Sequence, residues 1–161
     1  MFFSDYYSPL GKINLLSDGE SLTGLFFDDK LTGDYKALPI FDDAKHWLDI
    51  YFSGQAPDFT PKLKIPGSEF QKLVYEIVLT IPFGDVMTYS EIAEVIAEKR
   101  GLASMSPQAV GGAVGCNSIP LIIPCHRVIG KNGKLVGYFG GIDRKKKLLM
   151  LEGVDMSKLS V

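Results

Sequence analysis

The sequence predicts an α/β protein of the α+β kind, with a small N-terminal α/β domain followed by a mostly helical C-terminal domain. Three observations predict this: apolar runs split by turn signals in the first third, apolar residues at helical spacing after residue 67, and a proline-rich stretch between them. The 161 residues are 46% hydrophobic and 22% charged, which is enough apolar material for a core. This composition excludes disordered, collagen-like and coiled-coil chains.

The N-terminal domain is predicted to contain a short antiparallel sheet and one helix. Residues 2–8, 12–17 and 22–27 are apolar runs bounded by glycine-containing turns, which is typical of strands. Residues 41–52 carry an apolar set at helical spacing: Phe41, Ala44, Trp47, Leu48 and Tyr51. Residues 55–66 hold three prolines and few apolar side chains, so we expect a linker there and domains at 1–66 and 67–161.

The C-terminal domain is predicted to hold four helices, over residues 70–78, 90–99, 107–115 and 143–151. The second and third are short and are separated by a segment that begins at Gly101, which is typical of a helix-turn-helix. Residues 109–115 are built from Ala, Val and Gly only, a poor composition for a helix. Such a surface suits tight packing against a neighbouring helix, or close approach to another backbone such as the floor of a DNA groove.

Charge is divided unevenly along the chain. Residues 1–66 hold 10 acidic and 6 basic groups (net −4), whereas residues 67–161 hold 9 acidic and 11 basic groups (net +2). This permits a polyanionic partner for the C-terminal part but is weak evidence for one. The longest apolar run, near residues 119–124, is far too short to span a bilayer, and the N-terminus lacks the features of a signal peptide. We expect a cytoplasmic protein with reduced thiols and no membrane partner.

The residues around Cys125 form a candidate catalytic site. The residue follows an apolar run at 121–123, predicted to be a buried strand, and precedes His126 and Arg127. A cysteine beside positive charge and a general base is a candidate nucleophile, and the alternative is a buried structural cysteine. Adjacent side chains diverge on a strand, so His126 would need a bridging water to reach the sulfur. The cysteines and histidines show no metal-ligand spacing, so we expect no metal site.

The segment Pro-Cys-His-Arg-Val at residues 124–128 resembles the active-site signature of the O6-alkylguanine-DNA alkyltransferases. Further segments resemble this family in the same order: 81–84 with 88–93 as the first part of a helix-turn-helix, 109–113 as the recognition helix, Asn117 as a hinge, 137–141 as a pocket loop and 148–152 in the final helix. The resemblance covers roughly residues 68–153. Residues 1–66 are similar to the family's variable α/β domain only in their expected strands and helix, without matching motifs.

The resemblance implies a role for each matching residue. Cys125 would attack the alkyl carbon on O6 of guanine, and Tyr89 would donate a proton to N3 of the base. Glu152, His126 and a water would form the relay that deprotonates Cys125, with Asn117 ordering the network. The product thioether has no evident route back to the thiol, so the protein would act once, without a cofactor. The resemblance leaves open whether O4-alkylthymine is also a substrate.

The resemblance also implies a winged helix-turn-helix fold that binds double-stranded DNA through the minor groove, as a monomer, with the damaged base flipped out. Substrate contacts would come from a loop and a strand: Tyr138, Phe139, Gly140 and a carbonyl near Val128. DNA contacts would come from the helix-turn-helix: Ser90, Gln108, Ala109 and Gly111.

Two residues depart from the family pattern. Gln108 stands where an arginine usually fills the space left by the flipped base, which predicts weaker DNA binding. Phe139 stands where small or polar residues are usual. We expect the basic run 144–147 to form a solvated face rather than phosphate contacts, and Glu152 alone would also suit a solvated helix end.

The sequence leaves two other functions open. An alkyltransferase-like protein would bind the lesion without transferring anything, but such proteins lack the cysteine that this chain has. A cysteine hydrolase would need a histidine directly on the sulfur and an oxyanion hole.

Overall fold

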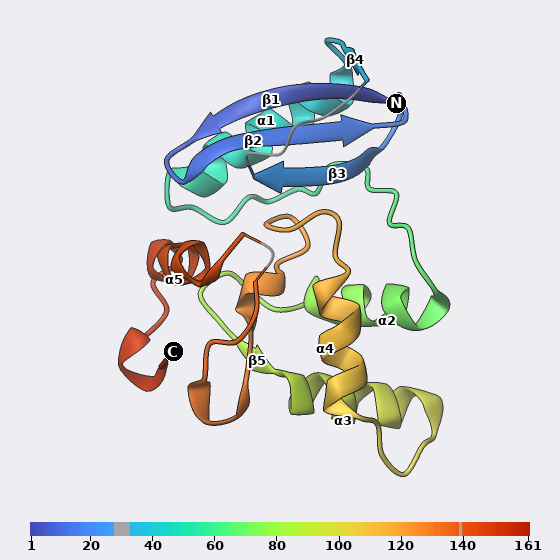
Figure 1. The fold of residues 1–161 in the computed structure, drawn as a ribbon, viewed down its shortest axis with the longest axis vertical. Helices are drawn as coiled ribbons and strands as arrows, with labels where there is room; N and C mark the ends of the chain where they lie inside the picture. The colour runs from blue at the N-terminus through green and yellow to red at the C-terminus, as the bar shows by residue number, and fades with distance from the viewer. Residues whose placement is uncertain (28–32, 139) are drawn as a thin grey trace. The chain divides into compact units, whose positions relative to one another are not determined.

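Residues 1–66 form a four-stranded sheet and one helix in the computed structural model, which describes residues 1–27, 33–138 and 140–161 (Figure 1). The strands are β1 (Phe2–Ser8), β2 (Gly11–Ser17), β3 (Leu22–Phe27) and β4 (Asp34–Tyr35), in the order β3-β2-β1-β4. The first three are antiparallel neighbours, and β4 pairs parallel with β1. The predicted sheet is confirmed, with β4 as an addition that the sequence analysis missed.

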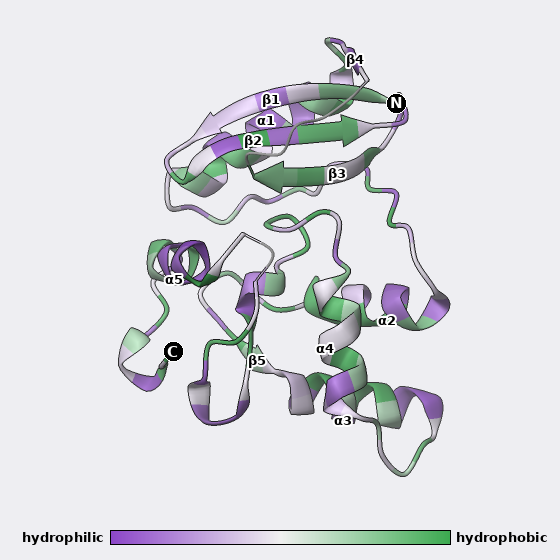
Figure 2. Ribbon diagram, viewed as in Figure 1, coloured by the Kyte–Doolittle hydropathy of each residue, from purple (hydrophilic) through white to green (hydrophobic). Residues whose placement is uncertain are grey.

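Helix α1 (Pro39–Phe52) covers one face of this sheet. Its inward stripe is the set predicted from helical spacing, and Leu48 and Tyr51 are fully buried. Apolar residues dominate β3 and recur in β2 (Figure 2), and Ile13, Leu15 and Leu25 are fully buried. The fold of this unit follows from burying one helix stripe against one sheet face.

The segment after α1, predicted to be a linker, also makes backbone hydrogen bonds with the sheet. The backbone N–H of Leu22 donates to the carbonyl of Lys62 at 2.8 Å, and the N–H of Lys64 donates to the carbonyl of Leu22 at 3.0 Å. Part of the predicted linker therefore pairs with the start of β3. The chain divides into two units after it, Met1–Pro66 and Gly67–Val161.

The second unit is built around helices α2 (Glu69–Val78), α3 (Tyr89–Arg100), α4 (Pro107–Gly115) and α5 (Ile142–Leu151). Ser68 and Thr88 start α2 and α3 with capping boxes, and Gly101 ends α3 in the left-handed conformation. Pro107 occupies the first turn of α4. Helices α3 and α4 pack together as the predicted helix-turn-helix. With a sheet and one helix in the first unit and mainly helices in the second, the predicted α/β class is confirmed.

A short parallel sheet brings the start of α3 beside the segment after Cys125. Strand β5 (Met87–Thr88) pairs with β6 (Val128–Ile129), with Met87 opposite Val128. Because β5 leads directly into α3, this pairing fixes Tyr89 near the chain that carries Cys125. The two-residue strands thus have a positioning role that their length does not suggest.

The strand expected at residues 121–123 is not formed. Leu121 has a φ of +76°, and the N–H of Ile123 donates to the carbonyl of Ile119 at 3.0 Å, so the segment is a tight turn. Prolines at 120 and 124 flank the run and supply no N–H for a strand ladder. Cys125 consequently begins the 3-10 helix η1 (Cys125–Arg127) rather than ending a strand.

The C-terminal tail closes the unit against the loop after β6. The 3-10 helices η2 (Lys131–Gly133) and η3 (Met156–Lys158) lie on the two sides of this contact. The N–H of Leu135 donates to the carbonyl of Ser160 at 2.6 Å, and that of Ser160 donates to Gly133 at 3.1 Å. Within the described ranges, no helix is long and apolar enough to span a membrane.

Candidate active site

Cys125 lies at the wall of a pocket of about 250 Å³ in the second unit. Helices α3 and α4, η1 and the loop before α5 supply the lining: Tyr89, Gly111, Val114, Gly115, Cys125, Gly137 and Tyr138. The pocket thus brings together four of the predicted residues: Cys125, Tyr89, Tyr138 and Gly111. Cys125 is only 6% exposed, so a reacting group must enter the pocket to reach its thiol.

A buried acid–base pair follows the cysteine in sequence. His126 Nε2 lies 2.5 Å from Glu152 Oε2, and both side chains are fully shielded from solvent. Arg127 donates to both carboxylate oxygens of Glu152, at 2.8 and 3.2 Å, and the N–H of Gly84 donates to the same carboxylate at 3.0 Å. Glu152 is therefore not the solvated charge that its place at a helix end would suggest.

The charges of this network follow from its contacts. Burial acts to raise the pKa of Glu152, but the hydrogen bond from His126 and the hydrogen bonds and charge of Arg127 outweigh it and lower that pKa to about 2. Burial lowers the pKa of His126 and outweighs the attraction of Glu152. We therefore assign an ionised Glu152 and a neutral His126 whose Nε2–H donates to it. A neutral imidazole is a proton acceptor, which is what a base near a thiol must be.

The Cys125 thiol does not ionise on its own at neutral pH. Burial raises the pKa of Cys125 to about 11, although a hydrogen bond from Asn117 and the charge of Lys145 act in the opposite direction. A nucleophilic thiolate therefore has to be formed during reaction, with the proton passed to a base.

Asn117 holds the turn that leads to the cysteine. Its Nδ2 donates to the carbonyl of Ile123 at 2.9 Å, and its Oδ1 accepts from the N–H of Ile119 at 2.9 Å. These bonds span the turn in which Leu121 adopts its positive φ. Asn117 thus fixes the turn that precedes Cys125, and its role as a hinge in the reaction stays a prediction.

Two tyrosines, Tyr89 and Tyr138, line the pocket. Tyr89 donates weakly to the carbonyl of Val136, at 3.5 Å. The buried hydroxyl of Tyr138 has no hydrogen-bond partner among the described residues. Burial raises the pKa of both tyrosines, so both remain protonated donors at neutral pH.

A second pocket, of about 390 Å³, adjoins the first and shares Tyr89, Gly111 and Gly137 with it. Its other lining residues are Ser90, Pro107, Gln108, Lys131 and Val136. Three predicted DNA contacts, Ser90, Gln108 and Gly111, thus lie around one opening beside the cysteine pocket. The fourth, Ala109, is exposed on α4 but does not line it.

The small residues of α4 are only partly explained by packing. Val110 and Ala113 are buried, as packing requires. A Cβ at Gly112 would meet nothing within 4 Å, and one at Gly111 would make only an ordinary contact, 3.8 Å from the ring of Tyr89. Because the described residues leave room for side chains there, the two glycines favour close approach by another molecule.

Two predicted substrate contacts, Val128 and Gly140, do not line the described part of the pocket. Val128 is fully buried, and its carbonyl already accepts a hydrogen bond from Lys145 at 2.6 Å. The carbonyl of Gly140 accepts from Arg144 at 3.2 Å. Phe139 lies outside the described residues.

Sequence reasoning missed two buried cations. Arg127 anchors Glu152, and Lys145, which was expected on a solvated face, is fully buried. The signal for Lys145 is its spacing: Lys145, Leu148, Leu149 and Glu152 follow the i, i+3, i+4, i+7 pattern of one buried helix face. Within the described ranges, no three His, Cys, Asp or Glu side chains gather as metal ligands.

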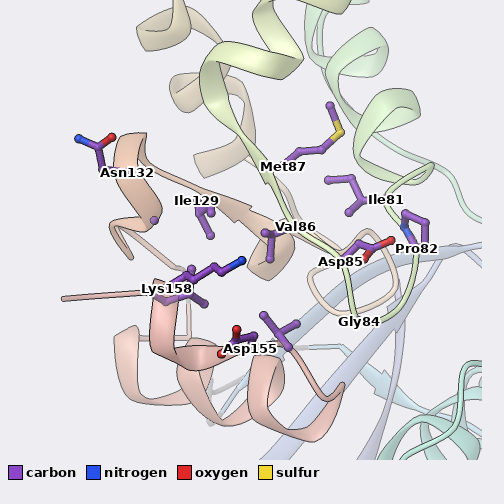
Figure 3. Close-up of a pocket in the computed structure, with 13 residues that line it drawn as sticks. Ile81, Pro82, Gly84, Asp85, Val86, Met87, Ile129, Asn132, Asp155 and Lys158 are labelled. Carbon is purple, nitrogen blue, oxygen red and sulfur yellow. The ribbon is translucent and has the colours of Figure 1, made fainter.

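A larger cavity of about 730 Å³ lies elsewhere in this unit, between the segment Ile81–Met87 and the C-terminal tail (Figure 3). No predicted site residue that the structure describes lines it. Its connection to the site is indirect: Gly84, on its wall, donates to Glu152. The smaller pocket, which contains the nucleophile, is therefore the candidate active site.

Together, the fold and the pocket define a helix-turn-helix protein with a buried cysteine at a pocket wall and a buried acid–base pair next to it in sequence. Comparison with known families agrees with both parts of the chain. The 6-O-methylguanine DNA methyltransferase DNA binding domain matches residues 69–154, and the ribonuclease-like domain of the same proteins matches residues 1–65. The chain belongs to the O6-methylguanine DNA methyltransferase family.

Individual relatives match over most of their length. The chain is 41% identical to the methylated-DNA–protein-cysteine methyltransferase of Mycobacterium leprae, over 90% of this chain and 88% of the relative. It is 40% identical to the methyltransferase of the same name from Methanosarcina acetivorans, over 95% of this chain and 99% of the relative. The crystal structure of Mycobacterium tuberculosis OGT in complex with DNA superposes with a TM-score of 0.81, at 36% identity, over 100% of this chain and 96% of that one.

Proposed function

We propose that this protein repairs DNA by direct reversal, moving an alkyl group from O6 of a flipped-out guanine to its own Cys125. The observation that carries the proposal is the buried cysteine in a small pocket with the His126–Glu152 pair next to it. Its relatives are named methylated-DNA–protein-cysteine methyltransferases, and one is described in complex with DNA. The proposed partner is double-stranded DNA.

The proposed chemistry is a displacement at the alkyl carbon. The sulfur of Cys125 forms a bond to that carbon as the bond from carbon to O6 breaks, and the electron pair leaves with the guanine. His126 accepts the thiol proton, through a water, and Glu152 stabilises the resulting imidazolium. The leaving guanine needs a proton, for which Tyr89 and Tyr138 are the candidate donors.

The second pocket and the N-terminal part of α4 are the proposed DNA-binding surface. Gln108, Ala109 and Gly111 would face the minor groove, and Ser90 lies beside them at the start of α3. Because the reaction needs Cys125 as a thiol, we propose a reducing, cytoplasmic location. We also propose a monomer that acts once, since the thioether product has no evident route back to the thiol.

Intact-protein mass spectrometry tests the function. After incubation with a duplex that contains O6-methylguanine, we expect a gain of about 14 Da, the mass of one CH₂, that saturates at one group per chain. The Cys125→Ala variant should gain no mass while still binding the duplex. Binding without any mass gain in the unaltered protein would instead favour a lesion-recognition role. Transfer retained in Cys125→Ala would assign another nucleophile, Cys116 being the remaining cysteine.

A further inference from the structure

The cavity of about 730 Å³ in the second unit shares no described lining residue with the cysteine pocket (Figure 3). Its walls are the segment 81–87, the β6–η2 region and the C-terminal tail. This volume lies within the range of about 300–1,000 Å³ that is usual for sites of small organic ligands. Apolar side chains make up most of the lining, among them Val86, Met87, Ile129, Val154 and Leu159.

One wall of the cavity holds Glu152 and Arg127 in place. The N–H of Gly84 donates to Glu152 at 3.0 Å, and the carbonyl of Ile81 accepts from Arg127 at 2.7 Å. Gly84 and Ile81 line the cavity, whereas Arg127 and Glu152 do not. The chain enters another wall shortly after Glu152, since Val154 follows it by two residues. A molecule in the cavity would therefore touch the groups that orient the Glu152 carboxylate.

The contact between this wall and Glu152 leaves little slack. Gly84 has a φ of +88°, and an added Cβ there would lie 3.1 Å from the carbonyl oxygen of Glu152. The carboxylate already accepts from Gly84 and from two nitrogens of Arg127. Because these donors are all in place, a shift of Gly84 can only lengthen a bond and loosen the carboxylate.

The charged groups around the cavity favour a cation. Asp85 and Asp155 come from different walls (Figure 3), and with Lys158 they give two negative charges and one positive, a net of −1. Asp155 is engaged already: it accepts from the hydroxyl and the N–H of Ser157 at 2.6 and 3.0 Å, and these bonds, together with the charge of Lys158, lower its pKa. Among the described residues, no side chain forms an ion pair or a hydrogen bond with the carboxylate of Asp85. The lining therefore suits a ligand with an apolar body and one positive charge that meets Asp85.

We propose that this cavity is a regulatory site for a small organic cation with an apolar body, and that its occupant slows alkyl transfer by shifting Gly84 away from Glu152. A ligand changes an equilibrium only through different affinities for two states, which here are the wall in place and the wall shifted. The effect on alkyl transfer rests on the proposed function. Binding, and its transmission to Arg127, do not, and they are tested without DNA.

The first experiment follows binding by NMR, with 3-phenylpropylamine as the probe. The amides of Val86, Met87 and Val154 report on the cavity, and the Nε–H of Arg127 reports on its bond to Glu152. We expect both sets of resonances to shift along one titration curve. 3-Phenylpropanoate, with the same body and the opposite charge, should bind at least threefold more weakly, and methylamine should cause no shift.

Each other result decides against a part of the proposal. Unshifted cavity amides would overturn the site, and a shift there without one at Arg127 would overturn its connection to Glu152. Equal binding of the amine and the carboxylate would overturn the assignment of a cation.

Three variants test whether the charge of the probe is read inside the cavity. Asp85→Asn should weaken binding of the amine about threefold, as expected for an exposed ion pair, and Lys158→Met should tighten it by removing a like charge. Asp143→Asn is the matched control, because this carboxylate lies at the start of α5 and does not line the cavity. All three positions are exposed, so the variants should fold. An equal loss of affinity in Asp85→Asn and Asp143→Asn would show general attraction to an acidic surface and would overturn the site.

The last experiment measures the consequence for alkyl transfer. Single-turnover transfer from an O6-methylguanine duplex is timed with saturating 3-phenylpropylamine and with methylamine at the same concentration, which matches the charge that DNA attracts. We expect a rate at least threefold lower with 3-phenylpropylamine only, and Asp85→Asn should need about three times more probe for the same effect. Equal rates would overturn the regulatory role. If no alkyl group is transferred with or without the probe while the Arg127 resonance still shifts, the proposed function fails and the binding site stands.

Discussion

Glu152 shows how a single residue acquires a function through its neighbours. Its carboxylate accepts from Arg127 and Gly84 and lies 2.5 Å from His126, so it is ionised and held in one orientation. In the proposed reaction, this oriented carboxylate would stabilise the charged imidazole that forms when His126 takes the thiol proton. At this scale the proposed active site is a set of three side chains, Cys125, His126 and Glu152, and burial and Arg127 set the charges of the acid–base pair.

Replacing Glu152 by Gln should therefore slow alkyl transfer in a pH-dependent way. At pH 7 we expect a loss of about 10²–10⁴-fold, typical of a lost general-base relay. The loss should shrink as the pH rises toward the Cys125 pKa of about 11, because the thiolate then forms without the relay. Single-turnover rates from pH 6 to pH 10 check this, with duplex binding as the control. An equal loss at every pH would contradict the assigned role.

The same network predicts acid sensitivity of the second unit. The pKa of Glu152 is lowered to about 2 in the folded state, from an ordinary value of 4.5. Its stabilising effect is thus fully present above pH 4.5 and is lost as the pH falls from 4.5 toward 2, on the order of 3 kcal/mol in total. His126, whose pKa is also lowered, acts in the same direction below its ordinary value of 6.5.

Hydrogen exchange of the α3–α5 amides between pH 3 and 7 checks this expectation, after correction for the intrinsic exchange rate. Tryptophan fluorescence would not report on the second unit, because the only tryptophan, Trp47, lies in the first. Glu152→Gln should flatten the dependence below pH 4.5. A wild-type protein with no pH dependence in this range would exclude an ionised Glu152.

At the scale of elements, sequence patterns predicted the long segments and missed the short ones. Helix α4 was predicted with the bounds that the structure shows, because Pro107 and the small residues that follow mark both ends. The apolar run at 121–123 was misassigned, because a short run does not distinguish a strand from a buried turn. Lys145 was misassigned because the basic run around it hid its place on the buried face with Leu148 and Leu149.

In the candidate site, too, local sequence patterns predicted some residues and missed others. The motif around Cys125 was visible because its residues are contiguous, and the distant Tyr89, Asn117 and Glu152 were found only through the family resemblance. Spacing alone could not show that Arg127 and Glu152, 25 residues apart, form a buried pair. Side-chain partners set by tertiary packing are the part that one sequence does not reveal.

The tail contact makes a prediction about Gly133. Its φ is +79°, and an added Cβ would lie 2.0 Å from the carbonyl oxygen of Lys158, so a side chain there must displace the tail. We expect Gly133→Ala to destabilise the second unit by about 2 kcal/mol. The amides of Leu135 and Ser160, which make the hydrogen bonds across this contact, should lose protection from exchange.

Gly112→Ala is the matched control. Its Cβ would meet nothing within 4 Å, and it lies inside α4, where alanine is favoured over glycine by about 1 kcal/mol. Thermal unfolding should therefore shift in opposite directions for the two variants. A Gly133→Ala protein as stable as the unaltered one would show that the tail does not depend on this close approach.

For the whole molecule, the balance of charge and the surface of α4 decide how it meets DNA. The second unit is positive (11 basic and 9 acidic groups) in a chain whose net charge is −2. Phosphate contacts release counterions, so the affinity for duplex DNA should fall with salt, by about 100-fold between 50 and 200 mM for about four contacts. Gln108, at the opening beside the cysteine pocket, adds no charge to this interaction.

Gln108→Arg should therefore tighten duplex binding and steepen the salt dependence, by up to about 0.9 in the slope of log K against log salt concentration. The reason is that arginine adds a cation, and a planar group that can stack, at the proposed groove-facing end of α4. Fluorescence anisotropy with a labelled duplex at four salt concentrations measures both quantities. Lys147→Gln, a loss of one charge on α5, controls for net charge alone. Unchanged affinity and slope in Gln108→Arg would place position 108 away from the DNA, and the groove-facing assignment of α4 would fail with it.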